Sequence, residues 1–198
     1  MKLHEILNED QLDELDLKHA LASLLIGAST FSINPHTPTK DNTVTAIKAI
    51  NRAPDQAKQL AAGILKKYKI NPEVALEISK LAIKHEKADF PKAPDILSVI
   101  GIESSFNPEA KSKLKHDPAL GLMQVRPGIW KLDKKELHSI ENQISSGTEI
   151  LNSYYVKLKD KTKALHAFNM GLTDFNKGKT NPNYIDKFQK ERTLYASL

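Results

Sequence analysis

The chain has 198 residues, enough for one domain of ordinary size and an additional segment. Apolar residues make up 40% of it and charged residues 27%, which is the balance of a globular protein. Because it contains no cysteine, disulfides and thiolate chemistry are excluded. The seven histidines show no paired ligand spacing, so we expect no metal site.

The net charge of +5 is distributed unevenly along the chain. Residues 1–40 contain three Lys and six Asp or Glu, a charge of −3, so the remainder carries +8. A basic body indicates an anionic partner, such as nucleic acid, a membrane surface or an acidic cell-wall polymer. Lysine-rich helices that are simply solvated explain the same charge equally well.

The first 42 residues differ in composition from the rest. An acidic, mildly amphipathic stretch is followed by the apolar run ALASLLIGASTFSI at 20–33. This run is shorter than the roughly 20 residues that cross a bilayer, and the acidic stretch before it is opposite in charge to the start of a signal peptide. We therefore expect a helical or extended docking arm and linker over 1–42, with a cryptic export signal as the less favoured alternative, and a domain over 43–198.

From about residue 43 onward the patterns are helical. The segment 71–87 opens with Asn71, a residue suited to cap a helix, and Pro72 at the first helical position. Since no window alternates with period two for long enough to indicate a strand, we predict an all-α fold. Helical spacing also recurs over residues 94–106, 141–160, 163–171 and 183–195.

A glutamate, Glu103, stands near the end of the predicted helix 94–106. Ile96, Val99 and Ile100 precede it by seven, four and three positions, which are spacings that share a helix face. A carboxyl group in apolar surroundings has a raised pKa and can act as a general acid near neutral pH. This segment alone nevertheless favours the simpler interpretation, a salt-bridged glutamate at a helix end.

Gly101, two residues before Glu103, permits the close approach of a neighbouring backbone or of a ligand. Pro108 is expected to end the helix soon after Glu103, because the residue before a proline disfavours the α conformation.

Five short motifs follow one another along the chain, and their order favours a catalytic glutamate over a salt-bridged glutamate at a helix end. Together they resemble the catalytic domain of soluble lytic transglycosylases, the goose-lysozyme-like enzymes that cleave peptidoglycan. The resemblance covers roughly residues 70–190. The motifs read Glu103-Ser104 with Phe106-Asn107-Pro108, Ala110-Lys111-Ser112, Gly121-Leu122-Met123-Gln124, Ala167-Phe168-Asn169-Met170-Gly171, and Tyr184-Ile185.

The resemblance implies a lysozyme-like helical domain with Glu103 as its catalytic acid and no cofactor. It also implies substrate contacts by Ser112, Met123, Gln124, Asn169 and Tyr184. Four of these side chains also have a structural alternative: a loop hydroxyl for the serine, core packing for the methionine, a helix cap for the asparagine and interhelical packing for the tyrosine. The tyrosine hydroxyl is expected within reach of the glutamate.

This chain departs from the family pattern in the stretch KLKHDPAL, residues 113–120, which is longer than usual and lacks the usual Gly-Ala. Arg126 and Phe168 also replace residues common in the family. An ordinary hydrolase needs a second carboxylate. The candidates are Asp117, which is better explained as a turn residue before Pro118, and Asp174.

The expected reaction is therefore non-hydrolytic cleavage of peptidoglycan glycan strands, which yields a 1,6-anhydromuramic product. A hydrolytic muramidase and a wall-binding module without activity are the alternatives, and no nucleic-acid partner is expected because the lysines lack interleaved aromatics. A phage particle, with residues 1–42 docked on other particle proteins, or a phage lysis enzyme is the expected setting. The runner-up is the bacterial envelope or periplasm. No transmembrane span is expected.

Overall fold

The computed structural model describes residues 55–195, and the predicted arm and linker over 1–42 lie outside the described residues. This part of the chain is helical, with no strand and only two isolated bridges, Lys111 to Leu120 and Leu120 to Val125. The all-α prediction is confirmed. The helices are α3 (Asp55–Lys67), α4 (Pro72–His85), α5 (Ala93–Ser104), α6 (Pro127–Trp130), α7 (Ile140–Leu158), α8 (Lys161–Met170), α9 (Leu172–Asn176) and α10 (Pro182–Arg192), with 3₁₀ turns at Glu136–His138 and Thr193–Tyr195.

The helix starts follow from local capping chemistry. As predicted, the Asn71 side chain accepts a hydrogen bond from the backbone N–H of Glu73 at 2.7 Å, and Pro72 occupies the first position of α4. Asn181 followed by a proline repeats this arrangement at α10, where its side chain accepts from the N–H of Tyr184 at 3.2 Å. Capping of this kind fixes where each helix begins and therefore which residues face the core.

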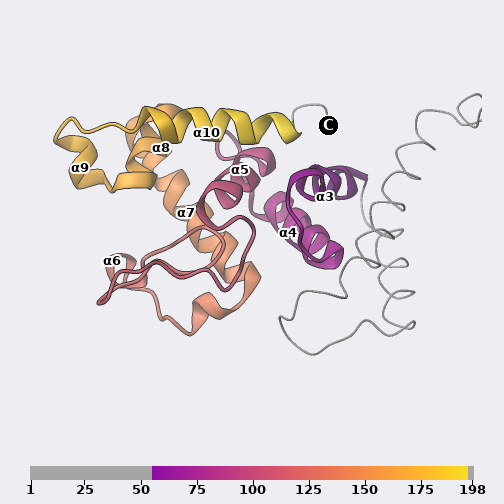
Figure 1. Ribbon diagram of the computed structural model, residues 1–198. Coiled ribbons are helices and arrows are strands. Elements are labelled where there is room, and N and C mark those ends of the chain that lie inside the picture. Colours follow the sequence, from indigo (N-terminus) through magenta and orange to yellow (C-terminus); the bar gives the residue numbers. More distant parts are fainter. Residues whose placement is uncertain (1–54, 196–198) are drawn as a thin grey trace, which may run out of the picture.

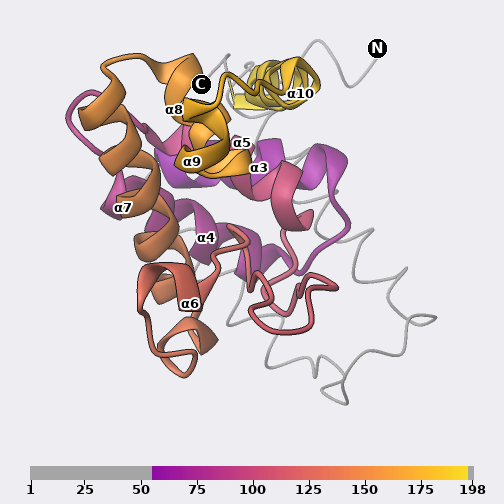
Figure 2. The ribbon, with the colours of Figure 1, turned by 90° about the vertical axis from the view of Figure 1, so that its left-hand side faces the viewer.

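Helix α5 lies in the middle of the described structure and packs against α4 and α10 (Figure 1). Four of its aliphatic side chains, Ile96, Leu97, Val99 and Ile100, are completely buried. In two views α10 lies along one edge and α6 at the opposite edge, while α7 runs from α6 to α8 (Figures 1 and 2). Among the described helices, none combines the length and the apolar character needed to cross a membrane.

The end of α5 differs from the prediction of a helix over 94–106. The helix stops at Ser104, because Ser105 and Phe106 both take left-handed backbone conformations, with φ of 53° and 63°. The N–H of Ser105 donates to the carbonyl of Gly101 at 3.2 Å, which closes the last turn. Phe106 is 1% exposed, and its ring packs on Tyr68 at 4.7 Å between ring centroids. Burial of this aromatic ring accounts for an end earlier than Pro108 alone requires.

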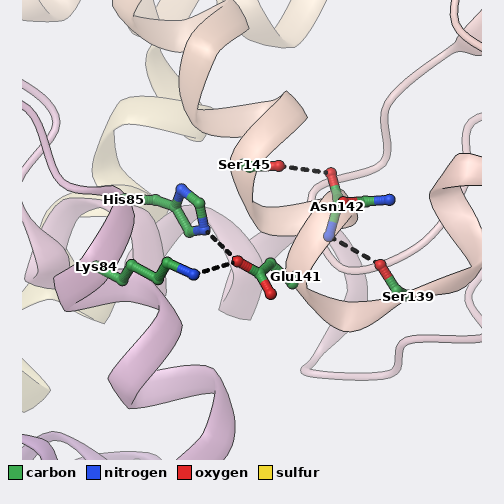
Figure 3. A network of polar contacts seen from close by, with 6 residues as sticks. All are labelled: Lys84, His85, Ser139, Glu141, Asn142 and Ser145. Carbon is green, nitrogen blue, oxygen red and sulfur yellow. Dashed lines mark hydrogen bonds and ion pairs between the residues drawn. The ribbon is translucent and has the colours of Figure 1, made fainter.

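Helices α4 and α7 are joined by an exposed polar cluster (Figure 3). The carboxylate of Glu141 accepts hydrogen bonds from Lys84 Nζ at 2.6 Å and lies 3.3 Å from His85 Nε2. Ser139 caps the start of α7 beside it. Such surface ion pairs add little stability, so the packing of the apolar faces holds these helices together.

Candidate active site

The last turn of α5 places Glu103 against Tyr184 at the start of α10. The phenolic O–H of Tyr184 donates to Glu103 Oε1 at 2.8 Å, and the tyrosine itself is 3% exposed. Burial raises the pKa of Glu103 to about 7, and the hydrogen bond from Tyr184 opposes this rise. Burial, aided by the nearby carboxylate, raises the pKa of Tyr184 well above its usual value. Tyr184 therefore remains a hydrogen-bond donor at neutral pH.

No Lys, Arg or His of residues 55–195 forms an ion pair with Glu103. A carboxyl group that is buried without a cation is neutral over a wider pH range than an ordinary glutamate. At neutral pH a substantial fraction of Glu103 is then protonated, as a general acid requires.

Gln124 lies in the turn at residues 121–124, within the segment that joins α5 to α6, and its side chain holds this turn together. Its Nε2 donates to the carbonyls of Gly121 at 2.9 Å and Ala110 at 3.2 Å. The backbone of Gly121, at φ 71°, donates its own N–H to the Ala110 carbonyl at 2.8 Å. The amide of Gln124 is thus largely engaged in the protein. Its Oε1 makes no hydrogen bond within the described residues and remains free to accept one from a ligand.

Ser112 closes the loop that departs from the family pattern. Its Oγ accepts from the N–H of Ala119 at 2.8 Å, and its own N–H donates to the Ala119 carbonyl at 2.9 Å. In this structure the hydroxyl shapes the loop and makes no bond to Glu103.

Met123 lies in the core, where it is 0% exposed. A Cβ placed on Gly147 would come within 2.5 Å of its Sδ, and Thr148 Oγ1 lies 3.9 Å from the same sulfur. In this structure the Met123 side chain packs in the core against Gly147 and Thr148 of α7, which is its structural alternative. The substrate contact expected of Met123 stays a prediction.

Asn169 is exposed near the end of α8, and it is not a helix cap. Its Oδ1 accepts from Asn181 Nδ2 at 2.9 Å. The N–H of Asn181 in turn donates to His166 Nδ1 at 3.1 Å. Because Asn181 also caps α10 at Tyr184, this chain of contacts ties the end of α8 to the partner of Glu103. The Asn-Pro pair at 181–182 signals the cap in the sequence, but nothing in the sequence indicated its contact with Asn169.

Two further side chains, Glu191 and Tyr68, lie close against α5 at Gly101. A Cβ on this glycine would lie 2.7 Å from Glu191 Oε1 and 2.8 Å from the Tyr68 hydroxyl. Tyr68 donates to Glu191 Oε1 at 2.6 Å, and Lys67 pairs with the other carboxylate oxygen. The close approach predicted at Gly101 is thus made by side chains of α10 and of the residue after α3. The sequence gave no signal for this cluster.

A third polar contact joins α10 to the start of α5. Arg192 Nε lies 2.7 Å from Asp95 Oδ1, and Asp95 Oδ2 accepts from the N–H of Lys92 at 3.0 Å. Because Asp95 is only 3% exposed, water cannot solvate its carboxylate, and the cation and the backbone donor take the place of that water.

The two candidates for a second catalytic carboxylate are both engaged elsewhere. Asp117 accepts from the N–H of Gly128 at 2.9 Å and pairs with Arg126 at 3.4 Å. Asp174 pairs with Lys179 at 3.2 Å. The unusual Arg126 thus anchors the loop that contains Asp117. In the described part of the chain, no group of His, Asp and Glu side chains could hold a metal ion.

A family model, the transglycosylase SLT domain, matches residues 80–190, more than half of the chain. The chain belongs to this family. The matched region runs from within α4 to within α10 and includes both Glu103 and Tyr184. Membership indicates lytic transglycosylase activity on peptidoglycan and a lysozyme-like helical fold. No curated protein and no solved structure matches the chain.

Proposed function

We propose that this SLT-family chain cleaves the β-1,4 bond between N-acetylmuramic acid and N-acetylglucosamine without water, and that Glu103 is its acid and base. The observation that carries the proposal is the environment of Glu103. It is partly buried, no cation within the described residues pairs with it, desolvation raises its pKa to about 7, and a tyrosine hydroxyl donates to one of its oxygens.

In the first step, protonated Glu103 gives its proton to the glycosidic oxygen as the bond from that oxygen to muramic C1 breaks. Since the hydroxyl of Tyr184 donates to Oε1, the proton is carried on Oε2, the oxygen left to face the substrate. The carbonyl oxygen of the substrate's own N-acetyl group bonds to C1 and stabilises the positive charge that develops there.

In the second step, the ionised Glu103 removes the proton from the muramic C6 hydroxyl. The C6 oxygen then bonds to C1 and displaces the N-acetyl oxygen, which closes the 1,6-anhydro ring. Glu103 is protonated again and no water is consumed. A single carboxyl suffices for both steps, in keeping with the engagement of Asp117 and Asp174 in structural contacts.

Substrate contacts are assigned to side-chain amide atoms that make no hydrogen bond within residues 55–195. The Oε1 of Gln124 can accept from a sugar hydroxyl or N-acetyl N–H, and the exposed amide N–H₂ of Asn169 can donate to a sugar oxygen. Ser112 contributes by fixing the loop beside Gln124 rather than by direct contact.

Mass spectrometry of peptidoglycan digested in H₂¹⁸O tests the reaction. We expect products that end in 1,6-anhydromuramic acid and contain no ¹⁸O. Reducing-end muramic acid that carries ¹⁸O would identify a hydrolytic muramidase instead. Binding of glycan strands without any cleavage would identify a wall-binding module.

We also propose a setting for this activity: local wall penetration by a phage particle or host lysis, with residues 1–42 as the segment that docks on particle proteins. Its support is the change from an acidic, apolar composition to a basic body. Quantitative mass spectrometry of purified particles is the test. Stable association with the particles is the expected result, and a bacterial envelope enzyme is the alternative if the chain is found only in host envelopes.

A further inference from the structure

A cationic loop, residues 111–119, follows the end of α5. Three of its side chains, Lys111, Lys113 and Lys115, are exposed. None of the three forms an ion pair within residues 55–195, whereas Lys84 and Lys87 each pair with a glutamate. The positive charge of the cationic loop is therefore not neutralised by the described part of the chain.

The cationic loop is anchored at both ends and near its tip. Ser112 and Ala119 exchange two hydrogen bonds across its base. Its single carboxylate, Asp117, accepts from the N–H of Gly128 and pairs with Arg126. Arg126 Nε also donates to the Asp117 carbonyl at 3.2 Å. The only acidic residue in the loop thus helps to hold the loop backbone in place relative to α6, while the exposed lysine side chains extend from this anchored backbone.

The cationic loop begins next to the candidate active site. Ala110, which precedes Lys111, accepts hydrogen bonds from Gln124 Nε2 and from the N–H of Gly121. Figure 2 shows the segment between α5 and α6 below α5, on the side of the molecule away from α10. A glycan that contacts Gln124 would therefore have the first lysine of the loop close by.

We propose that the cationic loop binds carboxylate groups of the stem peptides that muramic acid carries on either side of the cleaved bond. The inference rests on the proposed function, since it concerns the same substrate. The glycan of peptidoglycan is itself neutral where it carries these stem peptides, so the negative charge of the substrate lies on the peptides. Lysine ammonium groups at the ends of flexible side chains suit carboxylates whose spacing varies. Leu114, 51% exposed between two of the lysines, offers an apolar contact to the alkyl groups of the same peptides.

Nucleic acid does not fit this loop as well. Binding of single strands uses large aromatic side chains for base stacking, and residues 111–119 contain no Phe, Tyr or Trp. The charge of the loop is then the main feature that selects its partner, and the anionic partner that the proposed function brings to this site is the stem-bearing glycan.

The test compares two triple variants built on Glu103→Gln, so that the strands stay intact during the measurement. The first replaces Lys111, Lys113 and Lys115 with Gln. The matched control removes the same charge from the exposed positions Lys80, Lys157 and Lys163 on α4, α7 and α8. Dissociation constants are measured for soluble glycan strands with unmodified stems and for the same strands after their stem carboxylates have been converted to amides, at low and high salt.

We expect the loop variant to bind stem-bearing strands about three- to tenfold more weakly at low salt, with the difference reduced at high salt. Binding of the amidated strands should be the same for the loop variant and the control. Equal weakening on both kinds of strand, or equal affinity of the two variants for stem-bearing strands, overturns the proposal. A loss seen only with walls that retain phosphate polymers also overturns it, in favour of those polymers. Failure of the proposed reaction would be recognised separately, from ¹⁸O in the products of the unmodified protein.

Discussion

Two carboxylates of α5 receive different partners: Asp95 in its first turn, which is buried, and Glu103 in its last, which is partly buried. Asp95 is paired with Arg192 and accepts from a backbone N–H. Glu103 has only the neutral hydroxyl of Tyr184. Both partners come from α10. The same pair of helices therefore gives one carboxyl a cation as its partner and gives the other, whose pKa is raised to about 7, a neutral hydroxyl.

The difference follows from the cost of burying a charge. A nearby cation stabilises the ionised form of a buried carboxyl group, which then does not exchange protons near neutral pH. Without a cation, desolvation destabilises the ionised form and the pKa rises. Glu191 resembles Asp95 in its contacts, since Lys67 and Tyr68 both contact its carboxylate. Among these three acids, Glu103 is the one that no cation of residues 55–195 pairs with.

The largest effect is expected from Glu103→Gln, which keeps the shape of the side chain and removes its proton chemistry. Cleavage of peptidoglycan should fall by roughly a thousandfold or more, while circular dichroism remains that of the unmodified protein. The control is Glu149→Gln, at an exposed acid that pairs with Lys87, and it should cleave normally. Cleavage by the Glu103 variant at a normal rate contradicts the role of this residue.

The same substitution should change how stability depends on pH. The folded protein holds a proton on Glu103 that the unfolded chain releases between about pH 4.5 and 7, so this group lowers stability as pH rises through that range. The full penalty, up to roughly 3 kcal/mol, is present above pH 7 and absent below 4.5. Urea unfolding of both proteins at pH 4.5 and 8 should show Glu103→Gln as the more stable protein only at the higher pH.

Asp95→Asn should lower the stability of the fold and leave activity unchanged, whereas Glu103→Gln should abolish activity and leave the fold intact. Loss of the partner of Arg192 should lower the free energy of unfolding by about 2 kcal/mol, less than for a fully buried pair because the Arg192 side chain is 43% exposed. Activity per folded molecule should be unchanged. Urea titration and a cleavage assay under folding conditions measure the two quantities. A stable but inactive variant would contradict the division between the two carboxylates.

The smallest effect is expected from Tyr184→Phe. Since the tyrosine hydroxyl stabilises the ionised form of Glu103, its removal should raise the pKa of that carboxyl further. The rate of cleavage, which should fall as pH rises through about 7 in the unmodified protein, should then fall at a higher pH, and the maximal rate should drop about fivefold. Tyr155→Phe, at a ring that packs on Phe90, is the control and should leave the pH profile in place.

Local chemistry made much of this fold predictable. Asn71 before a proline indicated the start of α4, and the aliphatic spacing before Glu103 indicated its place at the edge of the core. The hydroxyl of Tyr184 was expected within reach of Glu103, although 81 positions separate them, because a family resemblance carries long-range information. The roles of the substrate-binding residues, Met123 included, stay predictions.

What the sequence could not indicate are the contacts that depend on how helices cross. The approach of Glu191 to Gly101 depends on the path of α10 over α5, and a glutamate in a lysine-rich helix has no pattern that marks it as buried. The end of α5 at Ser104 likewise depends on the burial of Phe106 against Tyr68, a residue outside the helix. Such contacts join residues far apart in the chain, so no local window contains both partners.

The position of α10 in the chain has a consequence for synthesis on the ribosome. Tyr184, Glu191 and Arg192 all lie in this helix, close to the end of the described residues. A nascent chain that has released only the helices before α10 would hold Asp95 without its cation, Lys67 without its acid and Glu103 without its hydrogen-bond donor. Wall-cleaving activity would then begin only after nearly the whole domain has been made, so that incomplete chains would not attack glycan.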